Sequence, residues 1–133
     1  MIFLDTGAFL ARYITKDQYH DPAIVSWEKI FQEGIACFTS NFVLNEVFTL
    51  LARRTTYEFA ARKAQLIYGS EKITTLRPSE ADEILAIQYL KKYADQAVSF
   101  TDCLSFVLMK KKKIRTAFSF DIHFQFAGFS EFT

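Results

Sequence analysis

The sequence contains little of what builds flexible or membrane-spanning proteins. Its 133 residues include only four glycines and two prolines, which argues against a long linker or a disordered tail. No apolar run approaches the ~18 residues that a membrane span needs. The N-terminal segment has no basic start and reaches Asp5 after a short apolar run, so it is unlike a signal peptide. We therefore expect a cytoplasmic protein without a membrane segment.

Cysteine and histidine are also scarce. The two cysteines, Cys37 and Cys103, form no CxxC pattern, and both lie within apolar stretches. Two buried free thiols are the simplest interpretation, and they suit a reducing compartment. The two histidines, His20 and His123, are far apart in the sequence and form no HExxH motif.

The charge balance predicts no strong overall field. Sixteen basic and fifteen acidic residues leave a formal net charge of +1, so a polyanion would have to be bound by a local basic patch. The basic run Lys110–Lys113 is more simply explained as a solvated helix end. Half of the residues are hydrophobic, with fifteen phenylalanines, which is enough for a sizeable core. Length and composition thus predict a single domain over residues 1–133.

Short apolar runs alternate with segments of helical periodicity. We expect strands at residues 2–4, 35–38, 72–76 and 116–120, a weaker fifth at 128–132, and helices at 24–34, 42–53, 56–68, 78–93 and 101–112. The last helix is apolar almost all round and should be deeply buried. This alternation predicts an α/β fold of three layers, α/β/α, with a central mainly parallel sheet of four to five strands. Ligand sites in such sheets lie beyond the carboxyl ends of the strands.

Two acidic residues stand at that edge of the predicted sheet. Asp5 directly follows the first strand, and Asp121 follows the fourth. Either one alone could equally be a cap at the start of a helix. Their shared place at the carboxyl ends of two strands favours a common site.

Two further carboxylates belong to predicted helices. Glu46 lies at the edge of an apolar helix face, where a half-buried carboxylate is costly unless it is paired or binds a cation. The alternative is that its side chain simply reaches solvent at the rim. Asp102 begins the buried helix, and the helix N-terminus would favour its negative charge with or without a ligand.

Converging carboxylates without a histidine or cysteine cluster call for a hard cation such as Mg²⁺ or Mn²⁺. Without such an ion, several carboxylates in one pocket would repel each other and raise their pKa values. Two ions about 3.5–4 Å apart can activate a water and stabilise the leaving oxygen of a phosphodiester. The predicted chemistry is therefore phosphodiester hydrolysis.

Four short segments resemble the successive motifs of PIN domains, particularly those of VapC-like toxin ribonucleases. They are FLDT near the start, TSNFVLNE in the middle, SFTDC later and FSFDIHF near the end, and their order and spacing agree with that family over essentially the whole chain. The resemblance implies that the metal-site carboxylates are Asp5, Glu46, Asp102 and Asp121. It also implies that the hydroxyls of Thr6 and Thr101 position water and the neighbouring carboxylates.

The same resemblance implies a function and partners. A VapC-like protein would be a Mg²⁺- or Mn²⁺-dependent endoribonuclease that acts on single-stranded or structured RNA. It would form a homodimer and would often be the toxin of a toxin–antitoxin pair, with the antitoxin occupying the active site. Two positions depart from the family pattern: Ser119 stands where threonine is common, and Ile122 stands where a basic residue is frequent.

Basic side chains would be needed to steer the RNA backbone. The candidates are Arg12, Lys16, Arg53 and Arg54, although each is more simply explained as an ordinary surface charge. Fifteen phenylalanines cannot all be stacking platforms, so we assign most of the aromatic residues to the core and name none of them as a base-binding residue.

Other functional classes fit the sequence less well. Asp5–Gly7 reads D-T-G, as in aspartic proteases, but that chemistry needs two carboxylates sharing one proton on an all-β scaffold. A phosphoryl-transfer domain with D-x-D fails because Gly7 occupies the second acidic position, and a receiver domain fails because its adjacent acidic pair is absent. The alternative that stays open is a PIN-like module that binds RNA or protein with weak or lost catalysis.

Overall fold

A computed structural model describes residues 1–132. Its centre is one sheet of five parallel strands in the order β3-β2-β1-β4-β5. The predicted α/β fold with a parallel sheet is confirmed. The strands are β1 (Ile2–Leu4), β2 (Cys37–Ser40), β3 (Ile73–Leu76), β4 (Thr116–Phe118) and β5 (Ser130–Glu131).

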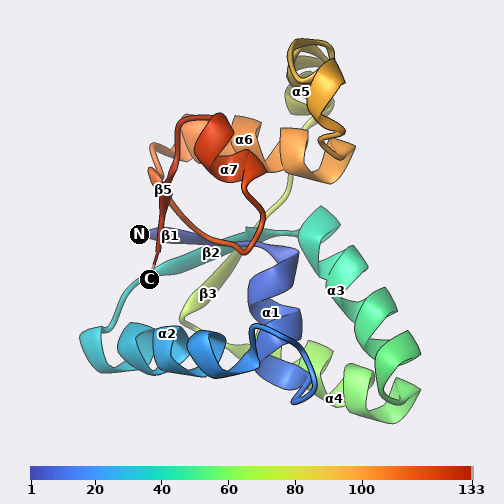
Figure 1. Ribbon diagram of the computed structural model, residues 1–133, viewed down its shortest axis with the longest axis vertical. Coiled ribbons are helices and arrows are strands. Elements are labelled where there is room, and N and C mark those ends of the chain that lie inside the picture. The colour runs from blue at the N-terminus through green and yellow to red at the C-terminus, as the bar shows by residue number, and fades with distance from the viewer. Residues whose placement is uncertain (133) are drawn as a thin grey trace.

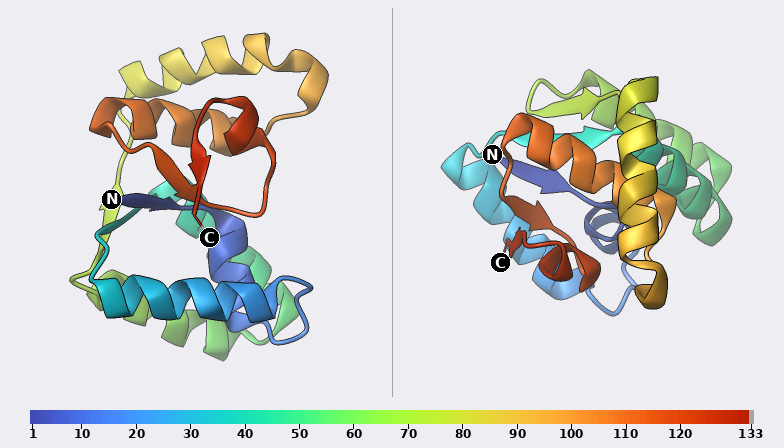
Figure 2. Two further views of the ribbon diagram at one scale, coloured as in Figure 1. Left: turned by 60° about the vertical axis from the view of Figure 1, so that its left-hand side comes forward. Right: turned by 90° about the horizontal axis from the view of Figure 1, so that it is seen from above.

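Helices cover both faces of this sheet, as predicted for three layers. Helices α1 to α4 lie on one face and α5 to α7 on the other, with α6 between the sheet and α5 (Figure 1, Figure 2). The helices are α1 (Thr6–Tyr13), α2 (His20–Glu33), α3 (Asn41–Arg54), α4 (Tyr57–Gly69), α5 (Glu80–Lys92), α6 (Phe100–Lys112) and α7 (His123–Phe126).

The deep burial expected for the last long helix is confirmed. Every residue of α6 from Asp102 to Met109 is buried. Because α6 has the sheet on one side and α5 on the other, its sequence needs no broad polar face. Asp102 is the charged residue in this run, so its burial requires a separate explanation.

The second strand begins and ends two residues later than predicted. Cys37–Ser40 form β2, rather than residues 35–38. Thr39 is fully buried in this strand, and its hydroxyl donates a 2.9 Å hydrogen bond to the carbonyl of Leu4 in β1. That bond allows a polar residue to continue a buried strand. The hydroxyl of Ser40 then accepts from the backbone N–H of Val43 and caps α3.

The boundaries of other strands and helices also differ from the prediction. The fourth strand ends at Phe118, two residues earlier than predicted, and the fifth is shorter than predicted. Helix α2 begins at His20, four residues before the predicted start, and α1 follows β1 where the sequence pattern placed no helix. The remaining long helices agree with the prediction to within two residues.

The order of the strands creates a reversal point beside β1. From β1 the chain crosses one face of the sheet to reach β2 and β3, and it then returns over the other face to β4 on the opposite side of β1. Ligands of open parallel sheets bind where connections diverge in this way, outside the carboxyl ends of the strands. Asp5 follows β1 and Ser119 follows β4, so the fold places both residues at this point.

Two further predictions can be compared with the structure. Both cysteine thiols are buried and free, as expected. Among the helices of residues 1–132, none combines the length and the apolar character needed to cross a membrane.

Candidate functional site

An open pocket of about 670 Å³ lies at the reversal point. The four carboxylates singled out from the sequence all line it, although they come from the end of β1, from α3, from the start of α6 and from the loop after β4. The lining residues that matter here are Asp5, Thr6, Gly7, Asp17, Gln18, Tyr19, Glu46, Arg54, Ser99, Asp102, Phe120, Asp121, Ile122 and His123.

Asp5 lines this pocket and is buried, with 5% of its surface exposed. It occupies the N-cap position of α1, yet its carboxylate makes no capping hydrogen bond. Instead, Oδ2 of Asp5 accepts a 2.7 Å hydrogen bond from the hydroxyl of Ser119. The hydroxyl of Ser119 and the backbone N–H of Thr6 lower the cost of this charge, but two neutral donors are weak counterparts for a buried carboxylate.

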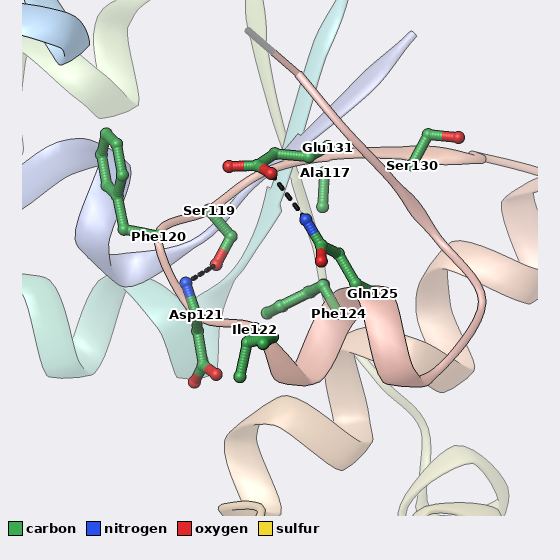
Figure 3. Close-up of a pocket in the computed structure, with 9 residues that line it drawn as sticks. All are labelled: Ala117, Ser119, Phe120, Asp121, Ile122, Phe124, Gln125, Ser130 and Glu131. Carbon is green, nitrogen blue, oxygen red and sulfur yellow. Dashed lines mark hydrogen bonds between the residues drawn. The ribbon is translucent and has the colours of Figure 1, made fainter.

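Ser119 joins the two acidic residues that follow the strands. Its Oγ donates to Asp5 and accepts a 3.0 Å hydrogen bond from the backbone N–H of Asp121 (Figure 3). In Figure 3 the carboxylate of Asp121 points away from Gln125 and Glu131, which bond to each other. The motif FSFDIHF alone gave Ser119 no role. The available signal was a hydroxyl placed directly after a strand and two residues before an acidic residue.

The two helical carboxylates are placed by different means. Asp102 is 7% exposed in the first turn of α6, where the hydroxyl of Ser99 accepts from its backbone N–H at 3.1 Å. Because Ser99 caps the helix, the Asp102 carboxylate is not needed for capping. Ser99 lines the pocket, whereas Thr101, the other predicted hydroxyl residue, does not. Glu46 reaches the pocket from α3 and is half-buried.

His123 adds a nitrogen to these oxygens. Its Nδ1 lies 2.8 Å from Oδ1 of Asp121 and 3.8 Å from Oδ2 of Asp102. This nitrogen is buried and has no well-directed hydrogen-bond partner among residues 1–132. One ligand atom from each of the three residues lies within 4.8 Å of the other two. Ligands of an octahedral ion with bonds of about 2.1 Å are roughly 3 Å apart when adjacent and about 4.2 Å apart when opposite, so these three atoms need only move slightly closer together to share one cation.

Burial raises the pKa of two carboxyl groups in the pocket. It raises the pKa of Asp5 to about 6, with the charges of Asp121 and Glu46 adding to the effect and the hydrogen bond from Ser119 opposing it. Burial raises the pKa of Asp102 to about 8, and the charges of Asp5, Asp121 and Glu46 again contribute. Each of the four acids therefore acts on another, and the pocket favours the uptake of protons or cations.

The donor set fits a hard divalent cation. Carboxylate oxygens predominate, which suits Mg²⁺ or Mn²⁺. The Oγ1 of Thr6 is also buried in this region and has no hydrogen-bond partner within residues 1–132. A buried polar atom of this kind is costly unless water or an ion satisfies it. The oxygen-rich metal site predicted from the sequence thus agrees with the chemistry of this pocket.

The four predicted RNA-steering residues lie in different places. Arg54, at the end of α3, lines the pocket, whereas Arg53 lines a separate groove between α3 and α4. The guanidinium of Arg12 lies 4.4 Å from the ring centre of Trp27, and Lys16 is exposed but does not line the pocket. Of the four, the structure brings Arg54 alone to the acids.

These raised pKa values predict that the metal-free protein is destabilised by its own site. The folded state binds protons at Asp5 and Asp102 more tightly than the unfolded chain, whose carboxyl groups titrate near pH 4. Stability should therefore fall as the pH rises from about 4 towards 8. In EDTA at pH 8, Asp5→Asn should raise the melting temperature by several degrees, roughly 3–6 °C, because the amide oxygen can still accept from Ser119.

Thermal unfolding followed by circular dichroism at pH 5 and pH 8 measures this effect. Asp95→Asn, which changes an exposed acid outside the pocket, is the matched control and should not alter the melting temperature. A lower melting temperature for Asp5→Asn at pH 8 would show that its buried charge is already well compensated within the chain.

Comparison with known proteins supports this fold. A family model described as the PIN domain matches residues 2–129. VapC20 of Mycobacterium tuberculosis, named a 23S rRNA-specific endonuclease, is 34% identical over 132 residues, which cover 98% of this chain and 97% of that protein.

Solved structures show the same relationship. A crystal structure of Mycobacterium tuberculosis VapC20, described as a sarcin-ricin loop cleaving toxin, is similar with a TM-score of 0.85 and 31% identity, covering 97% of this chain and 96% of that one. FitAcB from Neisseria gonorrhoeae shares the fold, with a TM-score of 0.67 and 16% identity over 100% of this chain and 97% of that chain. The family suggested by four short motifs is therefore confirmed, and the chain belongs to the PIN-domain family of nucleases.

Proposed function

We propose that this protein is a Mg²⁺- or Mn²⁺-dependent endoribonuclease that hydrolyses RNA phosphodiester bonds. The observation that carries the proposal is the meeting of Asp5, Glu46, Asp102 and Asp121 in one pocket at the reversal point of the sheet. Membership of the PIN-domain family and the named activity of the relative VapC20 support the same reaction.

The residues of the pocket would have different roles in this reaction. Asp5, Asp102 and Asp121 would hold the cation, with Glu46 and His123 beside them. Ser119 hydrogen-bonds the Asp5 carboxylate and the backbone N–H of Asp121, and it thereby holds the two acidic residues next to each other at the pocket. A divalent ion bound there would lower the pKa of a water molecule and offset charge on the phosphate. Thr6 and Ser99 supply hydroxyl groups near the acids, while the predicted role of Thr101 stays a prediction.

The substrate and partners follow from the relatives and remain part of the proposal. VapC20 is named for 23S rRNA and for its sarcin-ricin loop, so a hairpin with that loop is the first substrate to test. We propose that the protein acts in the cytoplasm as the toxin of a toxin–antitoxin pair. We also propose that it forms a homodimer, as the resemblance to VapC-like proteins implies.

The first test is cleavage of RNA by the purified protein. With Mn²⁺, it should cut a sarcin–ricin hairpin, and EDTA should stop the reaction. Asp5→Asn should lower the rate at least about 100-fold, and Ser119→Ala roughly 10- to 100-fold, since even residues that orient metal ligands are worth that much. Asp95→Asn should cut as the parent does. A protein that binds the hairpin and leaves it intact with Mn²⁺ and with Mg²⁺ would instead be the non-catalytic module.

A second test concerns contact with the RNA backbone. Arg54 lines the acidic pocket, and Arg53, its neighbour in the chain, does not, so the two form a matched pair. If Arg54 contacts a phosphate, Arg54→Gln should lower the slope of log Kd against log salt by about one. Arg53→Gln should leave that slope unchanged. Fluorescence anisotropy of labelled RNA at several salt concentrations measures both, and equal slopes for all three proteins would refute the contact.

A further inference from the structure

Two aromatic rings lie face to face at the acidic pocket. The rings of Tyr19 and Phe120 have centroids 4.5 Å apart and planes only 4° from parallel. Both residues line the pocket together with the four carboxylates. Phe120 directly precedes Asp121, while Tyr19 lies at the end of the loop between α1 and α2. The stack therefore joins two distant segments beside the site.

The inner ring is firmly held. Phe120 meets the buried ring of Phe118 edge to face, with centroids 5.9 Å apart and planes at 70°. Gly7 lies directly beside the Phe120 ring: a Cβ added at Gly7 would be 3.6 Å from Cδ2 of Phe120, which is van der Waals contact. Phe120 is thus supported by the core on one side and is half-buried.

The outer ring is also placed by its backbone. The N–H of Tyr19 donates a 2.8 Å hydrogen bond to Oδ1 of Asp17, and its carbonyl accepts from the N–H of Ala23 at 3.0 Å. The Tyr19 side chain nevertheless remains 40% exposed. One face of this ring is covered by Phe120, so a flat, preorganised aromatic surface is presented at the pocket.

The negative charge of the pocket favours an uncharged contact, such as this aromatic surface, for binding RNA. Among residues 1–132, the pocket is lined by five carboxylates, those of Asp5, Asp17, Glu46, Asp102 and Asp121, and by one permanently charged basic group, the guanidinium of Arg54. Even with a divalent ion bound, this balance gives a polyanion little electrostatic attraction. Stacking of a base on an aromatic ring does not depend on net charge and tolerates any of the four bases.

We propose that Tyr19 is a stacking platform for an unpaired base of the RNA, with Phe120 as its support. An unpaired nucleotide that stacks on the exposed part of the Tyr19 ring extends the two-ring stack to three, and its phosphate then lies beside Asp121, which follows Phe120 in the chain. Gln18 and Asp17, which also line the pocket, are near enough in the chain to offer polar groups to the edge of that base. The inference rests on the proposed ribonuclease function and adds to it the residue that orients the substrate.

Three variants of the full chain test the platform. Tyr19→Leu removes the ring and keeps an apolar side chain, whereas Tyr19→Phe keeps the ring and removes the hydroxyl. Tyr57→Leu changes a tyrosine on α4 that is 78% exposed and does not line the acidic pocket. Because Tyr19 is an exposed residue outside the core, thermal unfolding should show that all three proteins fold like the parent.

The probe is a sarcin–ricin hairpin in which the unpaired purines are replaced, one at a time, by fluorescent 2-aminopurine. Single-turnover reactions with Mn²⁺ give the protein concentration at half-maximal rate, and the early fluorescence change reports stacking before cleavage. Tyr19→Leu should raise that concentration about 5- to 150-fold and abolish the quenching at one position of the probe. Tyr19→Phe should stay within about twofold of the parent and retain the quenching, and Tyr57→Leu should match the parent.

Each contrary outcome has one meaning. If the parent cuts the hairpin and Tyr19→Leu matches it in both readouts, the platform is refuted and the ribonuclease proposal stands. If Tyr19→Phe loses as much as Tyr19→Leu, the hydroxyl rather than the ring makes the contact, and stacking is refuted. If the parent neither cuts the hairpin nor quenches its fluorescence, the proposed function on this RNA and the inference fall together.

Discussion

The mutual repulsion of negative charges that the fold forces together is the constraint on which this site depends. Strands β1 and β4 are neighbours, so Asp5 and the loop that carries Asp121 leave the sheet side by side, and α3 and α6 bring Glu46 and Asp102 to the same pocket. Among residues 1–132, the groups that oppose this repulsion are hydrogen-bond donors of Ser119, Thr6 and Ser99 and the nearby His123, and none of them carries a permanent positive charge. The arrangement is unfavourable for an empty protein and favourable for one that binds a divalent cation.

Apolar packing beside the acids stabilises the fold against this repulsion. Phe3 and Leu4 are fully buried immediately before Asp5, and α6 is buried from Asp102 to Met109. These apolar contacts hold the acids at fixed positions, whereas acids on a flexible surface would move apart. Asp82 offers a contrast: it is buried, but the Ser79 backbone and the ammonium of the exposed Lys111 lower its pKa, so that its charge is compensated within the chain. Asp5 and Asp102, whose pKa values are raised, form no ion pair with a lysine or arginine among residues 1–132.

The sequence was sufficient to predict the architecture and the four acids. Strand–helix alternation indicates a parallel sheet, and a parallel sheet brings residues at the carboxyl ends of different strands to one edge, which is why Asp5 and Asp121 could be paired from their positions alone. The two helical acids needed more: Glu46 and Asp102 each had an ordinary explanation, and the family motifs were required to group them with the others.

The residues that the sequence did not reveal depend on the path of loops and on side-chain directions. Ser119 serves both acids because the chain turns out of β4 at that residue, which periodicity cannot show. His123 meets Asp102 although the two belong to different helices, and the spacing of the histidines gave no sign of it. The sequence singled out no aromatic residue at the site, because a stack between Tyr19 and Phe120, 101 positions apart, leaves no pattern in the sequence. Such details follow from tertiary contacts, whereas strands and helices follow from local periodicity.

The most direct measurement of the central claim is anomalous diffraction from crystals of the full chain soaked in Mn²⁺. We expect one or two manganese peaks in the pocket, at about 2.0–2.3 Å from carboxylate oxygens of Asp5, Asp102 or Asp121, with none of comparable height elsewhere on the protein. Manganese bound only at other acidic residues, with this pocket free of anomalous density, would contradict it.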